Sequence, residues 1–224
     1  MTRRLGVFRD MNFSDYWKSL RYSLYTMRRP LTGFWDLVHE KRGSLAAAHT
    51  IVAVAVIVQV MRLTLTNFQF IIVHMEVFNV VMVAGQILMP LLLWVVANWC
   101  LTTLMDGKGK LSEIYMGTAY ALTPMVLIDA FLIPVSHFIT FEEGAVYWVL
   151  TSIAALWFVL LLIAAMMEIH DYSLGKTLLS SFLTIIAIAI IVFIFIMFFA
   201  VVSDGIMYFV VLAQELMFRF DLRF

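Results

Sequence analysis

Charged residues and cysteine are both scarce in this chain of 224 residues. Only 13% of the residues are charged and 63% are hydrophobic, whereas a soluble domain has about 25% charged residues. A chain of this length cannot hide so much apolar surface from water, so we expect lipid to be its main solvent. The single cysteine, Cys100, excludes an internal disulfide framework, and its apolar surroundings predict a small buried residue.

Catalytic and ligand-binding signatures are also missing. The sequence has no GxSxG element, no Walker A loop and no dinucleotide fingerprint. Its five histidines show no metal-ligand spacing, and we interpret the neighbouring Glu168, His170 and Asp171 as a solvated loop. We therefore predict a protein that is not an enzyme and that uses no cofactor or metal.

Long apolar stretches dominate what is present. Each is long enough to cross a bilayer, which takes about 20 residues. The sequence predicts an all-α fold, a multi-pass transmembrane bundle of five helices within a domain of residues 45–202. The predicted spans cover approximately residues 45–66, 77–105, 113–137, 145–167 and 177–202.

Residues 1–44 predict a basic amphipathic elbow on the cytoplasmic side of the membrane. Apolar residues recur on one helical face, at Phe13, Trp17, Leu20, Leu24 and Met27. Pro30 ends or bends this helix, and a second short piece that carries Trp35 follows. Basic and aromatic residues together are typical of a helix in the headgroup region, so membrane lipids fit this segment better than nucleic acid does. A partner-docking surface that includes Trp17 and Trp35 is the alternative.

The C-terminal residues 203–224 predict an extracytoplasmic amphipathic tail. From Phe218 to Phe224, apolar and charged residues alternate strictly, and this period of two indicates a strand. Such a strand could extend a sheet of a partner protein; the end of an interfacial helix or a frayed tail is the alternative. The candidate partner-binding residues here are Phe218, Phe220, Leu222 and Phe224.

The distribution of basic residues predicts the orientation. Twelve of the fifteen Lys and Arg residues fall in the N-terminal segment and the loops on the same side of the membrane. Because cytoplasmic loops carry the excess of positive charge, the N-terminus is predicted to be cytoplasmic. An odd number of spans then places the C-terminus outside, in a protein of the cell membrane.

The third predicted span, residues 113–137, is unusual because it contains two prolines and Asp129. Asp129 is the only ionisable residue that we place well inside a span, where an acid costs about 2.5–3.5 kcal/mol. Two interpretations stand: a kinked structural helix, or a proton or cation site at a broken helix. The candidate intramembrane polar site comprises Asp129, Gln86, Gln59, Tyr120 and Pro124, with the two glutamines as the expected partners of the acid.

Four short segments resemble one family. Residues 119–124 read Ala-Tyr-Ala-Leu-Thr-Pro and resemble the Tyr-to-Pro signature in the third span of the Yip family, the Ypt-interacting membrane proteins. Residues 40–44, 107–110 and 170–176 are similar to the family's polar segments at the span ends. The resemblance covers roughly residues 30–202 and implies a five-span, non-enzymatic membrane protein.

The N-terminal segment resembles the bacterial branch of the family. A compact basic elbow stands where the eukaryotic members carry a long Pro-rich region, so we do not transfer their binding of Rab-type GTPases. We predict a membrane adaptor or accessory subunit that assembles with other integral membrane proteins, such as the subunits of a bacterial transporter complex. The alternative is a protein that translocates a solute, ion or lipid through the broken third helix and Asp129.

Overall fold

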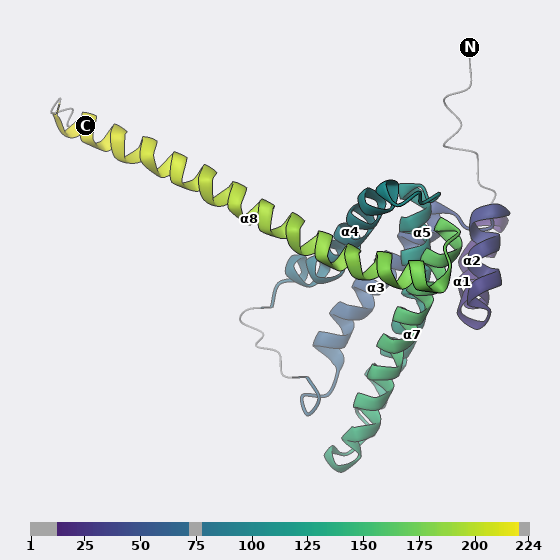
Figure 1. Cartoon of the computed structure of the whole chain (residues 1–224). Helices are drawn as coiled ribbons and strands as arrows, with labels where there is room; N and C mark the ends of the chain where they lie inside the picture. The colour runs from purple at the N-terminus through teal and green to yellow at the C-terminus, as the bar shows by residue number, and fades with distance from the viewer. Residues whose placement is uncertain (1–12, 72–77, 220–224) are drawn as a thin grey trace.

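A computed structural model of the chain describes residues 13–71 and 78–219 (Figure 1). Within these ranges the regular elements are all helices. They are α1 (Phe13–Arg28), α2 (Pro30–His39), α3 (Leu45–Leu65), α4 (Val80–Leu104), α5 (Leu111–Ala121), α6 (Thr123–Val135), the short 3-10 helix η2 (Phe141–Glu143), α7 (Gly144–His170) and α8 (Leu174–Arg219).

Five helical segments are long and apolar enough to cross a membrane. They are α3, α4, α7, α8 and the pair α5–α6, which together form the third span. The predicted all-α bundle of five spans is therefore confirmed. Helices α1 and α2 precede the bundle and pack on each other and on its side, α1 on α3 and α2 on α7 (Figure 1).

Side-chain caps fix where the spans begin. The Ser44 Oγ atom accepts a hydrogen bond from the Ala47 N–H at 3.1 Å at the start of α3. The Asn79 side chain accepts one from the Val81 N–H at 2.8 Å at the start of α4. These bonds satisfy amide groups that the first turn of a helix leaves without a partner.

The core lies mainly at one end of the bundle. Its largest buried side chains there are Phe34, Leu37, Ile114, Tyr120 and Leu161, which join α2, α5 and α7. A smaller cluster at the other end contains Phe70 stacked on Tyr147, with ring centroids 4.7 Å apart. In lipid, such clusters stabilise the fold through close packing, since lipid tails are as apolar as the side chains.

The fully buried residues of α1 are polar, and only Leu20 and Met27 of its apolar stripe pack partly against the core. The buried residues are Ser19, Ser23 and Thr26, whereas Phe13 and Trp17 are exposed. A Cβ on Gly33 of α2 would lie 2.8 Å from the Thr26 Cα atom, so the two helices approach each other closely. The aromatic stripe of the elbow therefore stays available to lipid or to a partner.

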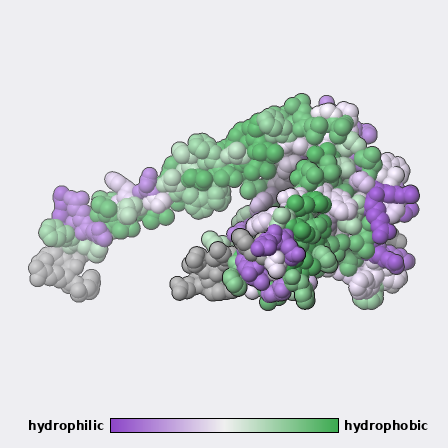
Figure 2. All heavy atoms as spheres, turned by 90° about the horizontal axis from the view of Figure 1, so that it is seen from below, coloured by the Kyte–Doolittle hydropathy of each residue, from purple (hydrophilic) through white to green (hydrophobic). Residues whose placement is uncertain are grey.

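Helix α8 continues well beyond the predicted end of the fifth span. Its 46 residues pass through Asp204 and Gly205 without interruption, and only Thr177, Ser180 and Thr184 are buried. All residues from 192 to 219 are exposed, and we call this segment the arm. Figures 1 and 2 show the arm projecting from the body with a largely hydrophobic surface.

The structure differs from the expectations for three single residues: Phe218, Cys100 and His170. Phe218 belongs to α8, so the strand interpretation fails for the part of residues 218–224 that is described; Phe220, Leu222 and Phe224 lie outside the described residues. Cys100 is exposed rather than buried, because it lies on a face of α4 that none of the other described helices covers. His170, expected in a solvated loop, is the last residue of α7 and is only 1% exposed.

Candidate functional site

The third span breaks where the sequence places Pro124. Helix α5 ends at Ala121 and α6 begins at Thr123, with Pro124 in its first turn. Proline has no N–H to donate to the Tyr120 carbonyl one turn earlier. The Thr123 hydroxyl donates to that carbonyl instead, at 2.7 Å, so the freed backbone oxygen has a partner within the helix and is not an open ligand.

Tyr120, one turn before the break, binds the elbow to the bundle. Its side chain is fully buried. Its hydroxyl lies 2.8 Å from the Ser19 Oγ atom and donates to the Ser19 carbonyl at 3.1 Å. It also accepts a hydrogen bond from the Ser44 N–H at 3.4 Å. We call Tyr120, Ser19 and Ser44 the Tyr120 cluster; it joins α1, the start of α3 and the third span at one point.

A second buried polar cluster joins α4, α7 and α8. The His170 Nδ1 atom accepts from the Gly109 N–H at 3.3 Å, which leaves Nε2 to donate to the Asn98 Oδ1 atom at 2.9 Å. Asn98 then donates to the Thr184 hydroxyl at 3.2 Å. In this His170 cluster every polar side chain has a partner, so its form indicates structural support rather than catalysis.

Glycines let the turn between α4 and α5 lie directly on His170. A Cβ on Gly107 would lie 2.8 Å from the His170 Nδ1 atom, and one on Gly109 would lie 2.5 Å from Ile169. Any larger residue at these positions would push the turn away. Positions 107 and 109 therefore need glycine because the turn packs against the end of α7.

An ion pair covers the same turn on the outside. The Lys108 Nζ atom lies 2.7 Å from the Asp171 Oδ2 atom. Its hydrogen bond and positive charge hold the pKa of Asp171 below its ordinary value. Asp171 adopts a left-handed conformation, with φ of 57°, and turns the chain from α7 into α8.

These clusters contain the segments that carried the resemblance to the Yip family. A comparison with family models decides whether the chain belongs to it. The family model described as Yip1 domain matches residues 24–203. The chain belongs to the Yip1 domain family. No curated protein and no solved structure is significantly similar to it. In this Yip1 domain, the Tyr-to-Pro segment is the junction that holds the elbow, and the polar segments at 107–110 and 170–176 form one packed turn.

The candidate intramembrane residues divide between two places. Asp129, Gln59 and Gln86 line one cavity of about 290 Å³ between α3, α4 and α6, which we call the Asp129 cavity. Tyr120 belongs to the cluster described above, and Pro124 is buried at the start of α6. The predicted five-residue site is therefore not one constellation.

Arg62, rather than a glutamine, is the ionic partner of Asp129. The Arg62 Nη1 atom lies 3.5 Å from the Asp129 Oδ2 atom, and both side chains are largely buried. The Arg62 Nε atom also approaches the Tyr147 hydroxyl at 3.5 Å. The other oxygen of Asp129 is buried without a hydrogen-bond partner among the described residues.

The sequence interpretation missed Arg62 because it placed this residue at the outer end of a span. Arg62 is three residues before the end of α3, and a long arginine there can still reach into the bundle. The contacts of Asn98, Thr184 and Ser19 were not predicted either. A search for pairs of polar residues in different spans would have found candidates, but not their geometry.

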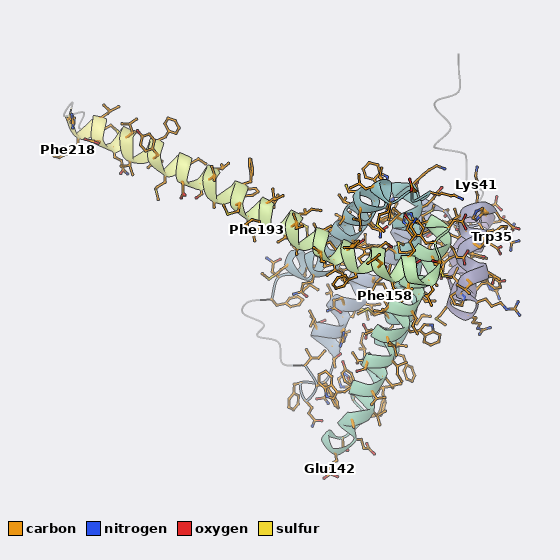
Figure 3. The ribbon with its side chains drawn as sticks, viewed as in Figure 1. Trp35, Lys41, Glu142, Phe158, Phe193 and Phe218 are labelled. Carbon is orange, nitrogen blue, oxygen red and sulfur yellow. The ribbon has the colours of Figure 1, made fainter. Side chains whose placement is uncertain are left out.

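The candidate partner-binding residues that are described are all exposed. Trp17 is 54% exposed, Trp35 45% and Phe218 88%. Trp35 stacks on His39, and Figure 3 shows Phe218 at the far end of the arm, away from the body and from Trp35. These residues thus form two separate surfaces, the elbow and the arm.

Proposed function

We propose that this Yip1 domain protein is a non-enzymatic membrane adaptor, which assembles with other integral membrane proteins through the arm of α8. The observation that carries the proposal is the length of α8. At about 1.5 Å per residue its 46 residues extend about 69 Å, roughly twice the hydrocarbon thickness of a bilayer.

At the tilts usual for membrane spans, one crossing does not use the whole helix. Even at a tilt of 40°, a core of about 30 Å takes only about 26 residues. Helix α8 begins at Leu174, beside the polar turn of the His170 cluster, so a crossing within this range of tilt leaves roughly its last 20 residues beyond the hydrocarbon. Those residues include Asp204, which fits a position outside the lipid core.

The projecting part of the arm is nevertheless apolar. Residues 206–212 read Ile-Met-Tyr-Phe-Val-Val-Leu, and all seven are exposed. A contiguous apolar surface of this kind indicates an interaction site when it faces water. A partner helix or a hydrophobic groove of another membrane protein would cover it, and an accessory subunit of a transporter complex would use it in this way.

Photo-crosslinking from single positions tests the proposal. A photoreactive residue at Phe209, which is 70% exposed in the arm, should form a protein adduct in cells. The matched control is Leu156 on the lipid-facing side of α7, which is 60% exposed and should give lipid adducts only. If neither position formed a protein adduct, the adaptor proposal would be overturned.

Translocation of a solute, ion or lipid is the second candidate. The buried, unpartnered Oδ1 atom of Asp129 at the Asp129 cavity favours it, whereas the pairing with Arg62 favours a structural role. Proteoliposomes with Asp129→Asn distinguish the two. If Asp129→Asn abolishes a solute flux and leaves the protein adduct at Phe209 unchanged, translocation is supported. If this variant loses neither the flux nor the adduct, the adaptor is supported.

A further inference from the structure

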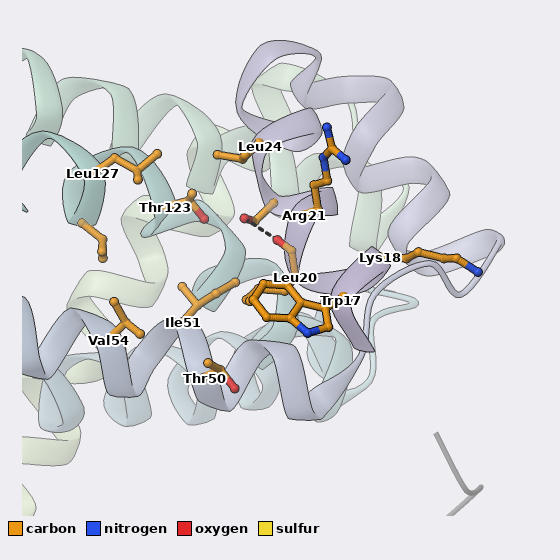
Figure 4. Close-up of a pocket in the computed structure, with 12 residues that line it drawn as sticks. Trp17, Lys18, Leu20, Arg21, Leu24, Thr50, Ile51, Val54, Thr123 and Leu127 are labelled. Atoms are coloured by element: carbon orange, nitrogen blue, oxygen red, sulfur yellow. Dashed lines mark hydrogen bonds between the residues drawn. The ribbon is translucent and has the colours of Figure 1, made fainter. Parts of the chain in front are cut away.

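An apolar groove opens between α1, α3 and α6. It has a volume of about 550 Å³, and Figure 4 shows Trp17, Ile51 and Leu127 around it. Its apolar lining consists of Trp17, Leu20, Leu24, Ile51, Val54, Val126 and Leu127. Val54 lies nine residues after the start of α3, about 13 Å along the helix axis, so the groove extends to the depth of acyl chains.

The three hydroxyl groups in the lining already have partners. The Ser23 hydroxyl donates to the Leu20 carbonyl at 2.8 Å. The Thr50 hydroxyl donates to the Ala46 carbonyl at 2.9 Å, and the Thr123 hydroxyl donates to the Tyr120 carbonyl at 2.7 Å. With these hydroxyls engaged, the groove offers an occupant mainly apolar contact, which suits a hydrocarbon chain.

A basic pocket of about 570 Å³ adjoins the groove. It is lined by Lys18, Arg21, Tyr22, Leu24, Tyr25, Arg28 and Arg42. Lys18, Arg21 and Leu24 line both spaces, so the apolar and basic compartments are continuous. In Figure 4 the charged ends of Lys18 and Arg21 point away from the apolar lining.

Two of the four cations have no acidic partner in the described part of the chain. Lys18 pairs with Asp15, and Arg42 pairs with Glu40. Neither Arg21 nor Arg28 forms an ion pair with a residue in the described ranges. The pocket therefore carries uncompensated positive charge beside a hydrocarbon-sized groove.

We propose that the elbow binds one anionic phospholipid of the bilayer, with an acyl chain in the groove and the phosphate between Arg21 and Arg28. Arginine guanidinium groups match phosphate oxygens in charge and geometry. A zwitterionic lipid would bring its own cation next to these arginines, and the pocket lining contains no carboxylate to receive it. Val54 and Leu127 are 39% and 44% exposed, so the groove is open to lipid from the side.

Retention of lipid by the full-length protein in mixed nanodiscs tests the proposal. Native mass spectrometry should detect one bound phosphatidylglycerol and less phosphatidylcholine. Replacing Arg21 and Arg28 by Gln should lower phosphatidylglycerol retention roughly 30-fold, since each basic residue near an anionic lipid contributes about a factor of five. The control pair Arg29→Gln/Lys41→Gln removes the same charge from the elbow outside both pockets.

Three outcomes would overturn the proposal. An equal loss in the control pair would mean that general surface attraction alone holds the lipid. Equal retention of the two lipids by the unchanged protein would remove the selectivity. If glycerol phosphate, which lacks acyl chains, displaced the lipid, the headgroup alone would account for binding. The groove would then hold no acyl chain.

A groove variant tests the second half of the site independently. Val54→Phe should fill the groove and lower retention while the basic pocket stays intact. An unchanged thermal midpoint would show that this variant folds. Full retention by Val54→Phe would contradict the seating of an acyl chain between α1, α3 and α6.

Discussion

At the scale of single residues, Tyr120 explains why a tyrosine stands one turn before the proline of the third span. The break at Pro124 ends α5 at Ala121, and the ring of Tyr120 fills the core beneath the elbow while its hydroxyl binds Ser19 and Ser44. Phenylalanine would keep the packing and lose these bonds. The tyrosine therefore holds α1 and the start of α3 against the third span, and its role is to position the elbow.

Tyr120→Phe should loosen the elbow. Loss of the hydroxyl leaves the buried Ser19 and the Ser44 N–H without a partner, at a cost of about 1–3 kcal/mol. We expect a lower thermal midpoint in mild detergent and faster tryptic cleavage after Arg28, between α1 and α2. Tyr208→Phe is the control, since Tyr208 is exposed in the arm. Cleavage at the same rate in both variants would rule out the anchoring role.

The Arg62–Asp129 pair should show strong coupling. Either single change, Arg62→Gln or Asp129→Asn, leaves one buried charge without its partner and costs on the order of 3–5 kcal/mol. The double variant removes both charges, so it should be more stable than either single variant. Thermal midpoints of the four proteins complete the cycle. Additive losses would show that the two groups, 3.5 Å apart, do not interact.

At the scale of elements, local sequence signals predicted the spans but not their contacts. Hydropathy alone gives five spans, and Pro124 alone gives the break between α5 and α6. The contacts of Tyr120 with Ser19 and of Asn98 with Thr184 join residues 101 and 86 positions apart, and no local periodicity encodes them. The same limit applies to Arg62, whose partner depends on how α3 and α6 pack.

The end of the fifth span shows a different limit of the sequence. The span was predicted to end at about residue 202, yet α8 continues to Arg219. A Cβ at Gly205 would meet no neighbouring atom within 4 Å, so this glycine is not required by packing inside the chain.

The ion pair between Lys108 of the α4–α5 turn and Asp171 at the end of α7 should depend on pH. Lys108 lowers the pKa of Asp171, so the ion pair stabilises the fold above the unfolded-state pKa of Asp171. This contribution is lost as the pH falls through the lower folded-state pKa. Lys108→Gln should raise the pKa of Asp171 toward its ordinary value, measured by NMR of the side-chain carboxyl.

Lys110→Gln is the matched control for this titration. Lys110 lies in the same turn but pairs with Glu113, so the pKa of Asp171 should stay low in this variant. The effect on stability should be small, since both Lys108 and Asp171 are more than 70% exposed. A pKa of Asp171 that does not respond to Lys108→Gln would exclude the ion pair as its cause.

At the scale of the whole molecule, the two proposed interaction surfaces lie at different places. The basic elbow and the polar turns gather where α3 and α8 begin and α4 and α7 end, whereas the arm projects from that body (Figure 1). An adaptor of this shape would hold a lipid at its elbow and a protein at its arm. Because the Tyr120 cluster links the elbow to the third span, and not to α8, each surface can be altered separately.

The orientation of the molecule is the last expectation, and cysteine labelling checks it. In a Cys100→Ser background, Lys41→Cys and Glu142→Cys introduce thiols at opposite ends of the body (Figure 3). Because basic residues favour the cytoplasmic side, an impermeant maleimide should label Glu142→Cys in intact cells and Lys41→Cys only after permeabilisation. Asp204→Cys in the arm is expected to follow Glu142→Cys, because an odd number of spans places the C-terminus outside when the N-terminus is cytoplasmic. The reverse pattern would invert the topology and place the arm, with its partner, in the cytoplasm.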